Sequence, residues 1–257
     1  DEALRVLAFA TRALPAVPGD EEDIERDLVL IGLVGMMDPP RPDVRQAVET
    51  CRTAGVRTVM ITGDHASTAR AIGRELDIFR PGDLVVTGAE LDEMDDAALD
   101  EAARNTSVFA RVSPLHKLRI VRALQHAGEV CAMTGDGVND APALKAADIG
   151  VAMGITGTDV AKDASDMILM DDRFTTIVYA VREGRRVFRN IQKVVSFLVA
   201  DNVAQIVVLL TAVALNWNAP LTAVMILWVN LATASLPALA LGVEPAAATS
   251  WSTRPCA

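Results

Sequence analysis

The chain has 257 residues, enough for one large domain or two modest ones, and a formal net charge of −10. This acidity argues against a surface that binds nucleic acid. The three cysteines lack metal-ligand spacing, and Cys51 and Cys131 stand in apolar patterns, so we expect reduced core thiols in a reducing compartment. The chain begins without Met and ends irregularly, and we expect both ends to be cut from a longer protein.

Most of the first 152 residues alternate between apolar runs of strand length and amphipathic segments of helical length. The runs at 28–35, 56–61, 107–112, 130–133 and 149–152 predict buried strands, and the segments at 42–54, 65–76, 114–125 and 139–146 predict helices. This alternation predicts an α/β fold built on a doubly wound parallel sheet. We expect the acidic stretch at 84–106 to be a solvated insertion.

Small and acidic residues follow two of the predicted strands. One strand leads into a Thr-Gly-Asp sequence at 62–64, and another leads into a second Thr-Gly-Asp at 134–136 that continues to Asp140. Both loops belong at the carboxyl ends of strands, where α/β enzymes place their ligands. Asp136 and Asp140 offer hard oxygen ligands that suit Mg²⁺, and the glycines let the backbone approach a phosphate. Gly-Asp-Gly also marks ordinary turns, so this motif alone is not decisive.

The last part of the chain is apolar enough to enter a membrane. The stretches at 194–215 and 221–243 are each roughly 22 residues long, which suffices to cross the core of a bilayer. The loop between them has no basic residue, whereas five precede the first stretch: Arg182, Arg185, Arg186, Arg189 and Lys193. The positive-inside rule then predicts that the soluble part is cytoplasmic. Two buried helices of a soluble domain are the alternative interpretation.

Four motifs stand in a fixed order along the chain. They are Asp38-Pro-Pro-Arg41, the Thr-Gly-Asp loop at 62–64, Phe109-Ala-Arg-Val-Ser-Pro114 with Lys117, and Thr134-Gly-Asp-Gly-Val-Asn-Asp140. A basic helix and the apolar hairpin follow them. In this order the chain resembles the P-type cation-transporting ATPases, and it is most similar to their calcium-pump-like branch, with bacterial members the best match. The resemblance implies a phosphorylation domain of the haloacid-dehalogenase type, ATP and Mg²⁺ as cofactors, and a multi-pass protein of the bacterial plasma membrane.

The resemblance also implies roles for individual residues. The phosphoryl group would be held by the loop residues Thr62, Gly63 and Asp64 together with Lys117. Catalytic Mg²⁺ would be held by Asp136 and Asp140, and nucleotide contacts would come from Arg5, Asp38, Arg41, Arg111 and Asn139. Cations and oriented donors around the charged oxygens are what phosphoryl transfer requires.

The same resemblance divides the chain into segments. Residues 1–27 would close a nucleotide-binding domain, 28–180 would form the phosphorylation domain, and 181–193 would be a basic amphipathic stalk helix. The transmembrane helices would be 194–215 and 221–243, followed by an irregular tail at 244–257.

The chain departs from the family pattern in its nucleophile. The phosphorylated aspartate of the family lies in an Asp-Lys-Thr-Gly-Thr sequence, which does not occur in these 257 residues. This chain alone is therefore not expected to turn over ATP, and the expected function is that of a longer protein.

The membrane hairpin departs from the pattern as well. The positions that bind the transported cation in calcium pumps correspond here to Asn202, Gln205, Asn230, Thr233 and Ala234, so Gln and Ala replace two carboxylates. Ca²⁺ prefers several carboxylate oxygens and is here only the family default; a monovalent cation or a single divalent ion stays open. Asp201 could return one carboxylate, although it lies about 100° around the helix. Pro237 predicts an interruption of the second span.

Other interpretations stay open. The Asp38–Arg41 motif could be only a helix-entry turn, Thr62 only a helix cap, Lys117 a solvated residue, and the intramembrane polar residues a source of interhelical hydrogen bonds. The three histidines, His65, His116 and His126, are predicted to be surface residues. For the whole chain the alternatives are a soluble phosphatase of the haloacid-dehalogenase type and a non-catalytic, truncated membrane paralogue. ATP, the transported cation and the lipid bilayer are the expected partners, and nucleic acid is not.

Overall fold

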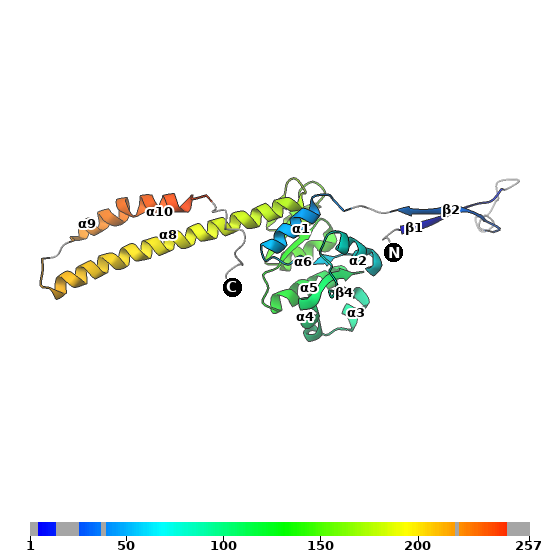
Figure 1. Cartoon of the computed structure of the whole chain (residues 1–257), viewed down its shortest axis with the longest axis horizontal. Coiled ribbons are helices and arrows are strands. Elements are labelled where there is room, and N and C mark those ends of the chain that lie inside the picture. The colour runs from blue at the N-terminus through cyan, green and yellow to red at the C-terminus, as the bar shows by residue number, and fades with distance from the viewer. Residues whose placement is uncertain (1–4, 14–25, 37–39, 219–220, 246–257) are drawn as a thin grey trace. The chain divides into compact units, whose positions relative to one another are not determined.

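The structure is a computed structural model that describes residues 5–13, 26–36, 40–218 and 221–245 (Figure 1). It divides into two compact units. The first consists of Asp1–Arg52 with Val56–Thr175, and the second consists of Thr53–Gly55 with Thr176–Ala257. The first unit carries the strands and short helices, and the second carries the long apolar helices, so each is described by itself.

Two parallel sheets form the centre of the first unit. One has the order β3-β5-β4 and the other the order β6-β7-β8. Their strands are β3 (Met60–Ile61), β4 (Leu84–Thr87), β5 (Thr106–Ala110), β6 (Ala132–Gly135), β7 (Ile149–Met153) and β8 (Met167–Leu169). All pairs within these two sheets are parallel, which confirms the α/β fold expected from the sequence. The strand expected at 56–61 is shorter than predicted, because 56–59 are not in a ladder.

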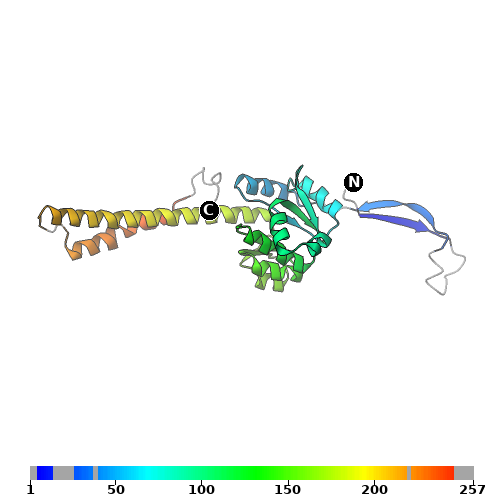
Figure 2. The same cartoon turned by 90° about the horizontal axis from the view of Figure 1, so that it is seen from below.

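Short helices alternate with these strands along the chain (Figures 1 and 2). They are α1 (Val44–Thr53), α2 (Ala66–Glu75), α3 (Gly88–Glu93), α4 (Asp96–Asn105), α5 (Pro114–His126), α6 (Ala141–Ala146) and α7 (Asp159–Asp163). Helix α2 packs on β4 and β5, α6 packs on β6 and β7, and α5 packs against both α4 and α6. The sheets are thereby joined through α5.

Helix α5 contributes to two buried clusters through neighbouring residues. Ile120 belongs to the cluster that also contains Phe109 of β5, and Val121 belongs to the cluster around Met133 of β6. Ile61 of β3 packs against both clusters. Because successive residues of a helix point about 100° apart, one helix can face both sheets. The carboxyl ends of β3 and β6 are therefore held to the same helix.

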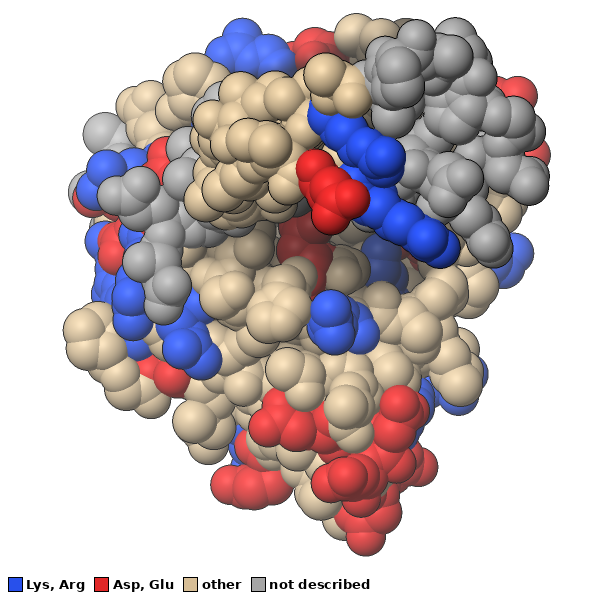
Figure 3. All heavy atoms as spheres, turned by 90° about the vertical axis from the view of Figure 1, so that its right-hand side faces the viewer, with Lys and Arg blue, Asp and Glu red and all other residues tan. Residues whose placement is uncertain are grey.

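The acidic stretch at 84–106 is not a solvated insertion, and that expectation was wrong. Its first residues form β4, which pairs in parallel with β5. Leu91 of α3 and Leu99 of α4 are almost fully buried in the same cluster as Phe109. Figure 3 shows acidic side chains gathered where α3 and α4 lie. The charges cover only the outer face of two short helices, and a few apolar residues suffice for the inner face.

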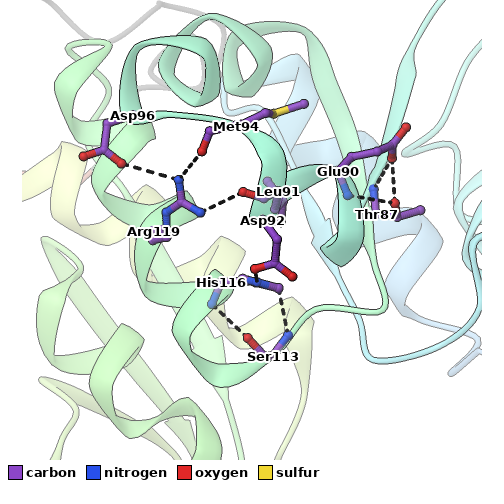
Figure 4. Close-up of polar contacts among 9 residues, drawn as sticks. All are labelled: Thr87, Glu90, Leu91, Asp92, Met94, Asp96, Ser113, His116 and Arg119. Carbon is purple, nitrogen blue, oxygen red and sulfur yellow. Dashed lines mark hydrogen bonds and ion pairs between the residues drawn. The ribbon is translucent and has the colours of Figure 1, made fainter.

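His116 is buried, although the sequence suggested a surface residue. Its backbone N–H donates to the hydroxyl of Ser113, and its ring Nδ1 accepts the N–H of Ser113, which completes a capping box at the start of α5 (Figure 4). Since Nδ1 accepts, the proton of the neutral ring lies on Nε2, which is 2.8 Å from Asp92 Oδ1. The imidazole thus links α5 to α3.

Arg119, one turn further along α5, strengthens the same contact (Figure 4). Its guanidinium donates to the carbonyl oxygens of Leu91 and Met94 at the end of α3, each at 2.8 Å. At the start of α3, Thr87 and Glu90 form a second capping box, and the hydrogen bonds from Thr87 lower the pKa of the Glu90 carboxyl. The acidic segment is therefore fixed at both ends of its first helix.

An antiparallel hairpin precedes these sheets in the sequence. Strand β1 (Arg5–Thr11) pairs with β2 (Val29–Met36), with Arg5 opposite Met36 and an irregularity between Phe9 and Ala10. The sequence predicted a buried strand at 28–35. The strand exists, but its burial was wrongly predicted: Val29 and Ile31 are 65% and 68% exposed. A continuous apolar run specifies a strand without specifying what covers it.

Neither of the two described cysteines is in a disulfide. Cys51 is buried and Cys131 is partly buried, as expected for reduced core residues. Burial, assisted by the negative charge of Asp148, raises the pKa of the Cys131 thiol, which makes the thiolate scarce. Cys256 lies outside the described residues.

In the second unit the predicted stalk and first span form one continuous helix, α8 (Phe174–Ala214), of 41 residues. The second span consists of α9 (Ala223–Trp228), a π-helical turn (Val229–Thr233) and α10 (Ser235–Gly242), which run back along α8 (Figures 1 and 2). Both stretches are long and apolar enough to cross a membrane. The expected interruption is present at the π turn, four residues before Pro237, because the proline ring cannot bond the carbonyl of the preceding turn.

The end of α10 is bound to α8. The side-chain amide of Asn190, which is buried, donates to the carbonyl oxygens of Gly242 at 3.2 Å and Glu244 at 2.9 Å. The ammonium of Lys193 lies 2.5 Å from a carboxylate oxygen of Glu244. These bonds satisfy carbonyls that the helix end leaves free, and they close the hairpin.

Candidate functional site

The loop after β3 is organised by its own threonine. The N–H of Thr62 donates to the carbonyl of Phe109 at 2.9 Å, and its hydroxyl donates to Asp64 Oδ2 at 2.8 Å. The N–H of Asp64 returns to the same hydroxyl at 3.1 Å. Thr62 is not the cap of α2, because the N-cap is His65. Gly63 is exposed, and a Cβ there would meet nothing within 4 Å, so the loop is open to a ligand.

The segment after β5 holds this loop in place. The N–H of Arg111 donates to the carbonyl of Asp64 at 2.9 Å, and the N–H of Val112 donates to the carbonyl of Thr62 at 3.2 Å. Arg111 has a φ of 53°, in the left-handed region that few residues other than glycine adopt. Its side chain is exposed. Such a strained backbone persists only where surrounding contacts hold it. Here the hydrogen bonds of Arg111 and Val112 join two loops at the ends of adjacent strands.

The loop after β6 is tied to α5 by an ion pair. The Lys117 ammonium lies 2.5 Å from Asp140 Oδ1, and the other carboxylate oxygen accepts the N–H of Gly137 at 3.1 Å. Asp140 is buried, and the Lys117 side chain is only 19% exposed. Lys117 is therefore not a solvated helix residue. It lies four residues before Val121, on the face of α5 that packs on the second sheet.

Gly135 is required for this pair to form. A Cβ at position 135 would lie 2.5 Å from Cβ of Asp140 and 2.8 Å from its Cγ. Replacing Gly135 by alanine should therefore displace Asp140 from Lys117 and destabilise the first unit by roughly 1–3 kcal/mol. Urea unfolding followed by circular dichroism measures this loss. Gly63→Ala is the matched control, since open space surrounds that position, and an equal loss in both variants would contradict the prediction.

Asp136 and Asn139 stand beside this pair with exposed side chains. The carbonyl of Asp136 accepts the N–H of Thr158 at 2.9 Å, which joins the loop to the start of α7. In the described part of the chain, no group of three or more His, Cys, Asp and Glu side chains could hold a metal. The exposed Asp136 carboxylate fits Mg²⁺, which is commonly bound by one or two carboxylates together with water and phosphate oxygens, whereas both oxygens of Asp140 are already bonded.

The four nucleotide candidates besides Asn139 have different surroundings. Asp38 and the side chain of Arg5 lie outside the described residues. Arg111 is exposed beside the phosphoryl loop, as described above. Arg41 donates through its guanidinium to the carbonyl of Asp172 at 2.5 Å, so Arg41 is bonded to the end of the first unit.

Asp172 was not identified from the sequence. It is buried, has a φ of 51°, and accepts hydrogen bonds from the N–H groups of Ile155 and Thr156 and from the Thr156 hydroxyl, at 2.8 to 2.9 Å. The hydrogen bond from Ile155 is the main cause that lowers the pKa of this carboxyl to about 2, while burial opposes the shift. Aspartates directly before a helix are usually helix caps, so the sequence does not indicate that Asp172 binds residues 155 and 156.

The second unit brings together only some of the expected membrane residues. The side-chain amide of Gln205 donates to Asn230 Oδ1 at 2.9 Å and to Asp201 Oδ2 at 2.8 Å. The amide of Asn202 instead donates to the carbonyl of Leu198 in its own helix at 2.8 Å. The side chain of Thr233 lies outside the described residues.

Two family models and several known proteins match this chain. Residues 6–148 match the family model of haloacid dehalogenase-like hydrolases, and residues 218–256 match the C-terminal model of cation-transporting ATPases. The chain is 53% identical to calcium-transporting ATPase 1 of Bacillus cereus over 95% of this chain and 28% of that protein. It is 52% identical to the calcium-transporting ATPase of Bacillus subtilis over 95% and 27%, and 48% identical to the cation-transporting ATPase pma1 of Synechocystis over 90% and 26%.

The chain thus spans little more than a quarter of the length of these relatives. The matches cover both units: the haloacid dehalogenase-like model covers most of the parallel sheets, and the ATPase model covers the second apolar span. The chain belongs to the haloacid dehalogenase-like hydrolases, and over 95% of its length it is similar to calcium-transporting ATPases.

Proposed function

We propose that the whole protein is an ATP-driven cation pump that works through an aspartyl-phosphate, and that this chain supplies its phosphoryl site and one membrane hairpin. The Lys117–Asp140 pair carries the proposal. It sets a cation and a carboxylate at the end of β6, on the helix that also packs on the sheet of β3. The chain lacks the Asp-Lys-Thr-Gly-Thr sequence, so the nucleophile has to come from elsewhere in the protein.

In this proposal the loop after β3 and Lys117 surround the transferred phosphoryl group. The Thr62 hydroxyl and the exposed backbone of Gly63 offer donors, and Asp64 fixes the Thr62 hydroxyl through its carboxylate. The Lys117 ammonium neutralises negative charge on the phosphoryl oxygens. Fixed donors and a cation around those oxygens stabilise the transition state of phosphoryl transfer.

Asp136 and Asp140 would hold Mg²⁺, which neutralises phosphate charge when it is bound. The exposed Asp136 carboxylate is available as a ligand, whereas Asp140 already bonds Lys117 and Gly137, so its main task is to orient the loop. Asn139 and Arg111, both exposed near these loops, would contact the nucleotide, together with Arg5 and Asp38. Arg41 could join them only by giving up its bond to Asp172.

The hairpin would carry the transported cation across the bilayer through Asn202, Gln205, Asn230 and Thr233. Ca²⁺ is the default because the relatives from Bacillus are named calcium-transporting ATPases. The basic residues before 194 support a cytoplasmic first unit by the positive-inside rule, and the whole protein would be a multi-pass protein of a bacterial plasma membrane. Partners would be ATP, the cation and lipid, without nucleic acid.

The test is acyl-phosphate formation by the protein encoded by the complete gene, in native membranes, from radiolabelled ATP with Mg²⁺. We expect a hydroxylamine-sensitive phosphoprotein whose amount depends on an added cation. Asp136→Asn should lower it by about 100-fold, whereas Asp163→Asn, at an exposed carboxylate at the end of α7, should leave it unchanged.

The alternatives give different results in the same assay. A folded membrane protein that forms no phosphoprotein would be the non-catalytic paralogue. Cation-independent hydrolysis of small phosphate esters without labelling from ATP would indicate a phosphatase. Either outcome overturns the proposed pump.

A further inference from the structure

Asp201 is the sole ionisable residue of the sequence from 194 to 243. A carboxylate within a bilayer is expensive, and such residues are usually paired or face a polar pathway. Asp201 has no cationic partner on the rest of this hairpin, because the sequence between 194 and 243 contains none. A cation from solution would compensate its charge.

Asp201 is bonded to Gln205, which is itself bonded to Asn230 of the second span. Asp201 and Gln205 are four residues apart on α8 and share a face. One amide nitrogen of Gln205 donates to Asp201 at 2.8 Å and to Asn230 at 2.9 Å, so both of its hydrogens are used. Asp201 lies about 100° around α8 from the expected ligand Asn202. The amide of Gln205 nevertheless connects Asp201 to Asn230. Asn202, the residue expected at this position, is bonded to its own helix instead.

The hydrogen bonds leave oxygen atoms for a ligand. Asp201 uses one of its carboxylate oxygens for Gln205, and within the described residues no donor is bonded to the other. Gln205 is bonded through its nitrogen, which leaves its carbonyl oxygen, and Asn230 presents its carbonyl oxygen toward Gln205. A carboxylate and two amide oxygens are hard ligands of the kind that cations prefer.

The backbone around Asn230 gives independent support. Asn230 lies in the π-helical turn, where the N–H of Ala234 reaches the carbonyl of Val229 at 2.8 Å. The hydroxyl of Ser235 donates to the carbonyl of Asn230 at 3.2 Å. Irregular helix within a membrane is tolerated where it lines a polar cavity, and π turns are frequent at functional sites.

We propose that Asp201 is the anionic ligand of this hairpin for the transported cation, which it binds together with the amide oxygens of Gln205 and Asn230. This proposal rests on the pump function proposed above and names the residue that sets its charge. One carboxylate contributes one negative charge, so the hairpin supplies a single anionic ligand. Gln205 acts as the link that directs Asp201 toward the second span.

Cation-stimulated ATP hydrolysis by the complete protein in proteoliposomes tests this. Na⁺, K⁺ and Ca²⁺ are each titrated as the probe. Asp201→Asn should raise the half-saturating concentration of the stimulating cation by about tenfold or more, with the maximal rate largely kept, since it removes a ligand charge and not the catalytic groups. Asp201→Glu should restore most of the affinity. Thr211→Val is the matched control on α8, because the Thr211 hydroxyl bonds the carbonyl of Val207 in its own helix.

Gln205→Glu adds a second carboxylate beside the first. It should shift the ratio of half-saturating concentrations by about tenfold in favour of Ca²⁺ over the monovalent ions, because Ca²⁺ gains most from added carboxylates. A half-saturating concentration within twofold of the unmodified protein in Asp201→Asn would overturn the assignment of Asp201. A lack of cation stimulation in the unmodified protein would instead overturn the pump function, so the two failures are distinguishable.

Discussion

Replacing Lys117 by methionine should abolish phosphoprotein formation in the complete protein, with a loss of about 100-fold or more. Methionine keeps most of the stem that packs along α5, but it removes the ammonium that lies 2.5 Å from Asp140. The same change leaves a buried carboxylate with only the N–H of Gly137, which should cost roughly 1–3 kcal/mol of unfolding free energy. Labelling from ATP measures the first effect, and urea unfolding of this chain measures the second.

Two comparison variants separate charge from shape. Lys117→Arg keeps the positive charge, but its planar guanidinium does not reproduce the point contact of an ammonium, so it should recover stability better than activity. Lys145→Met removes an exposed lysine of α6 and should change stability by less than about 0.5 kcal/mol. If Lys117→Met labels as well as the unmodified protein, Lys117 has no part in the phosphoryl site.

The loops of the candidate site were predictable because each follows a strand of a parallel sheet. Apolar runs located β3 and β6, and small and acidic residues directly after such strands are typical of a ligand site. The Lys117–Asp140 pair could not be seen in this way, since it depends on α5 packing between the two sheets. Helical spacing predicts which face of α5 carries Lys117. Tertiary packing determines that Asp140 lies against this face.

The errors have one common cause. The segment at 84–106 was expected in solvent because it carries seven acidic residues, yet Leu91, Leu99 and Ala103 pack α3 and α4 into the core. The run at 28–35 was expected in the core because it is apolar, yet β2 pairs with β1 and is exposed. Composition reports how much apolar surface a segment has, and only the fold determines which side of it is covered.

For the membrane hairpin, too, the sequence predicted the helices but not the side-chain contacts between them. Length and basic flanks predicted both spans, and Pro237 predicted a broken second helix. The bond between Gln205 and Asn230 required the two helices to be placed side by side, and the turning of Asp201 toward it depends on a side-chain conformation. Asp201, one position before the expected ligand Asn202, can therefore take its place because the Gln205 amide connects Asp201 to the second span.

Replacing Asp172 by asparagine should lower the melting temperature of the chain by several degrees at pH 7. Asparagine tolerates the φ of 51° at this position, so backbone strain does not change. Its amide nitrogen, however, would face the N–H groups of Ile155 and Thr156 and the Thr156 hydroxyl, which all donate to the carboxylate. A donor would then oppose donors at a buried site, and at least one hydrogen bond would be lost.

The effect should depend on pH in a defined direction. The pKa of Asp172 is lowered from 3.8 to about 2 in the folded chain, so its carboxylate stabilises the fold above pH 4 and loses this contribution as the pH falls from 4 toward 2. The difference in melting temperature between the unmodified chain and Asp172→Asn should therefore be full at pH 7 and shrink below pH 4. Asp171→Asn, at the exposed neighbouring carboxylate, is the control and should change stability less at pH 7.

In the complete protein, the Asp172→Asn change should also affect the loop after β6, which carries the proposed Mg²⁺ ligands. Asp172 fixes residues 155 and 156, and the next turn, at Thr158, donates to the carbonyl of Asp136 at 2.9 Å. Loosening this loop should raise the Mg²⁺ concentration needed for half-maximal labelling several-fold, while saturating Mg²⁺ restores the rate, because Asp172 positions the loop without touching the metal. Equal Mg²⁺ dependence in Asp172→Asn and Asp171→Asn would show that the loop serves stability alone. If the Mg²⁺ concentration for half-maximal labelling rises only in Asp172→Asn, then the end of the first unit, where Arg41 bonds Asp172, supports the loop that carries the proposed Mg²⁺ ligands.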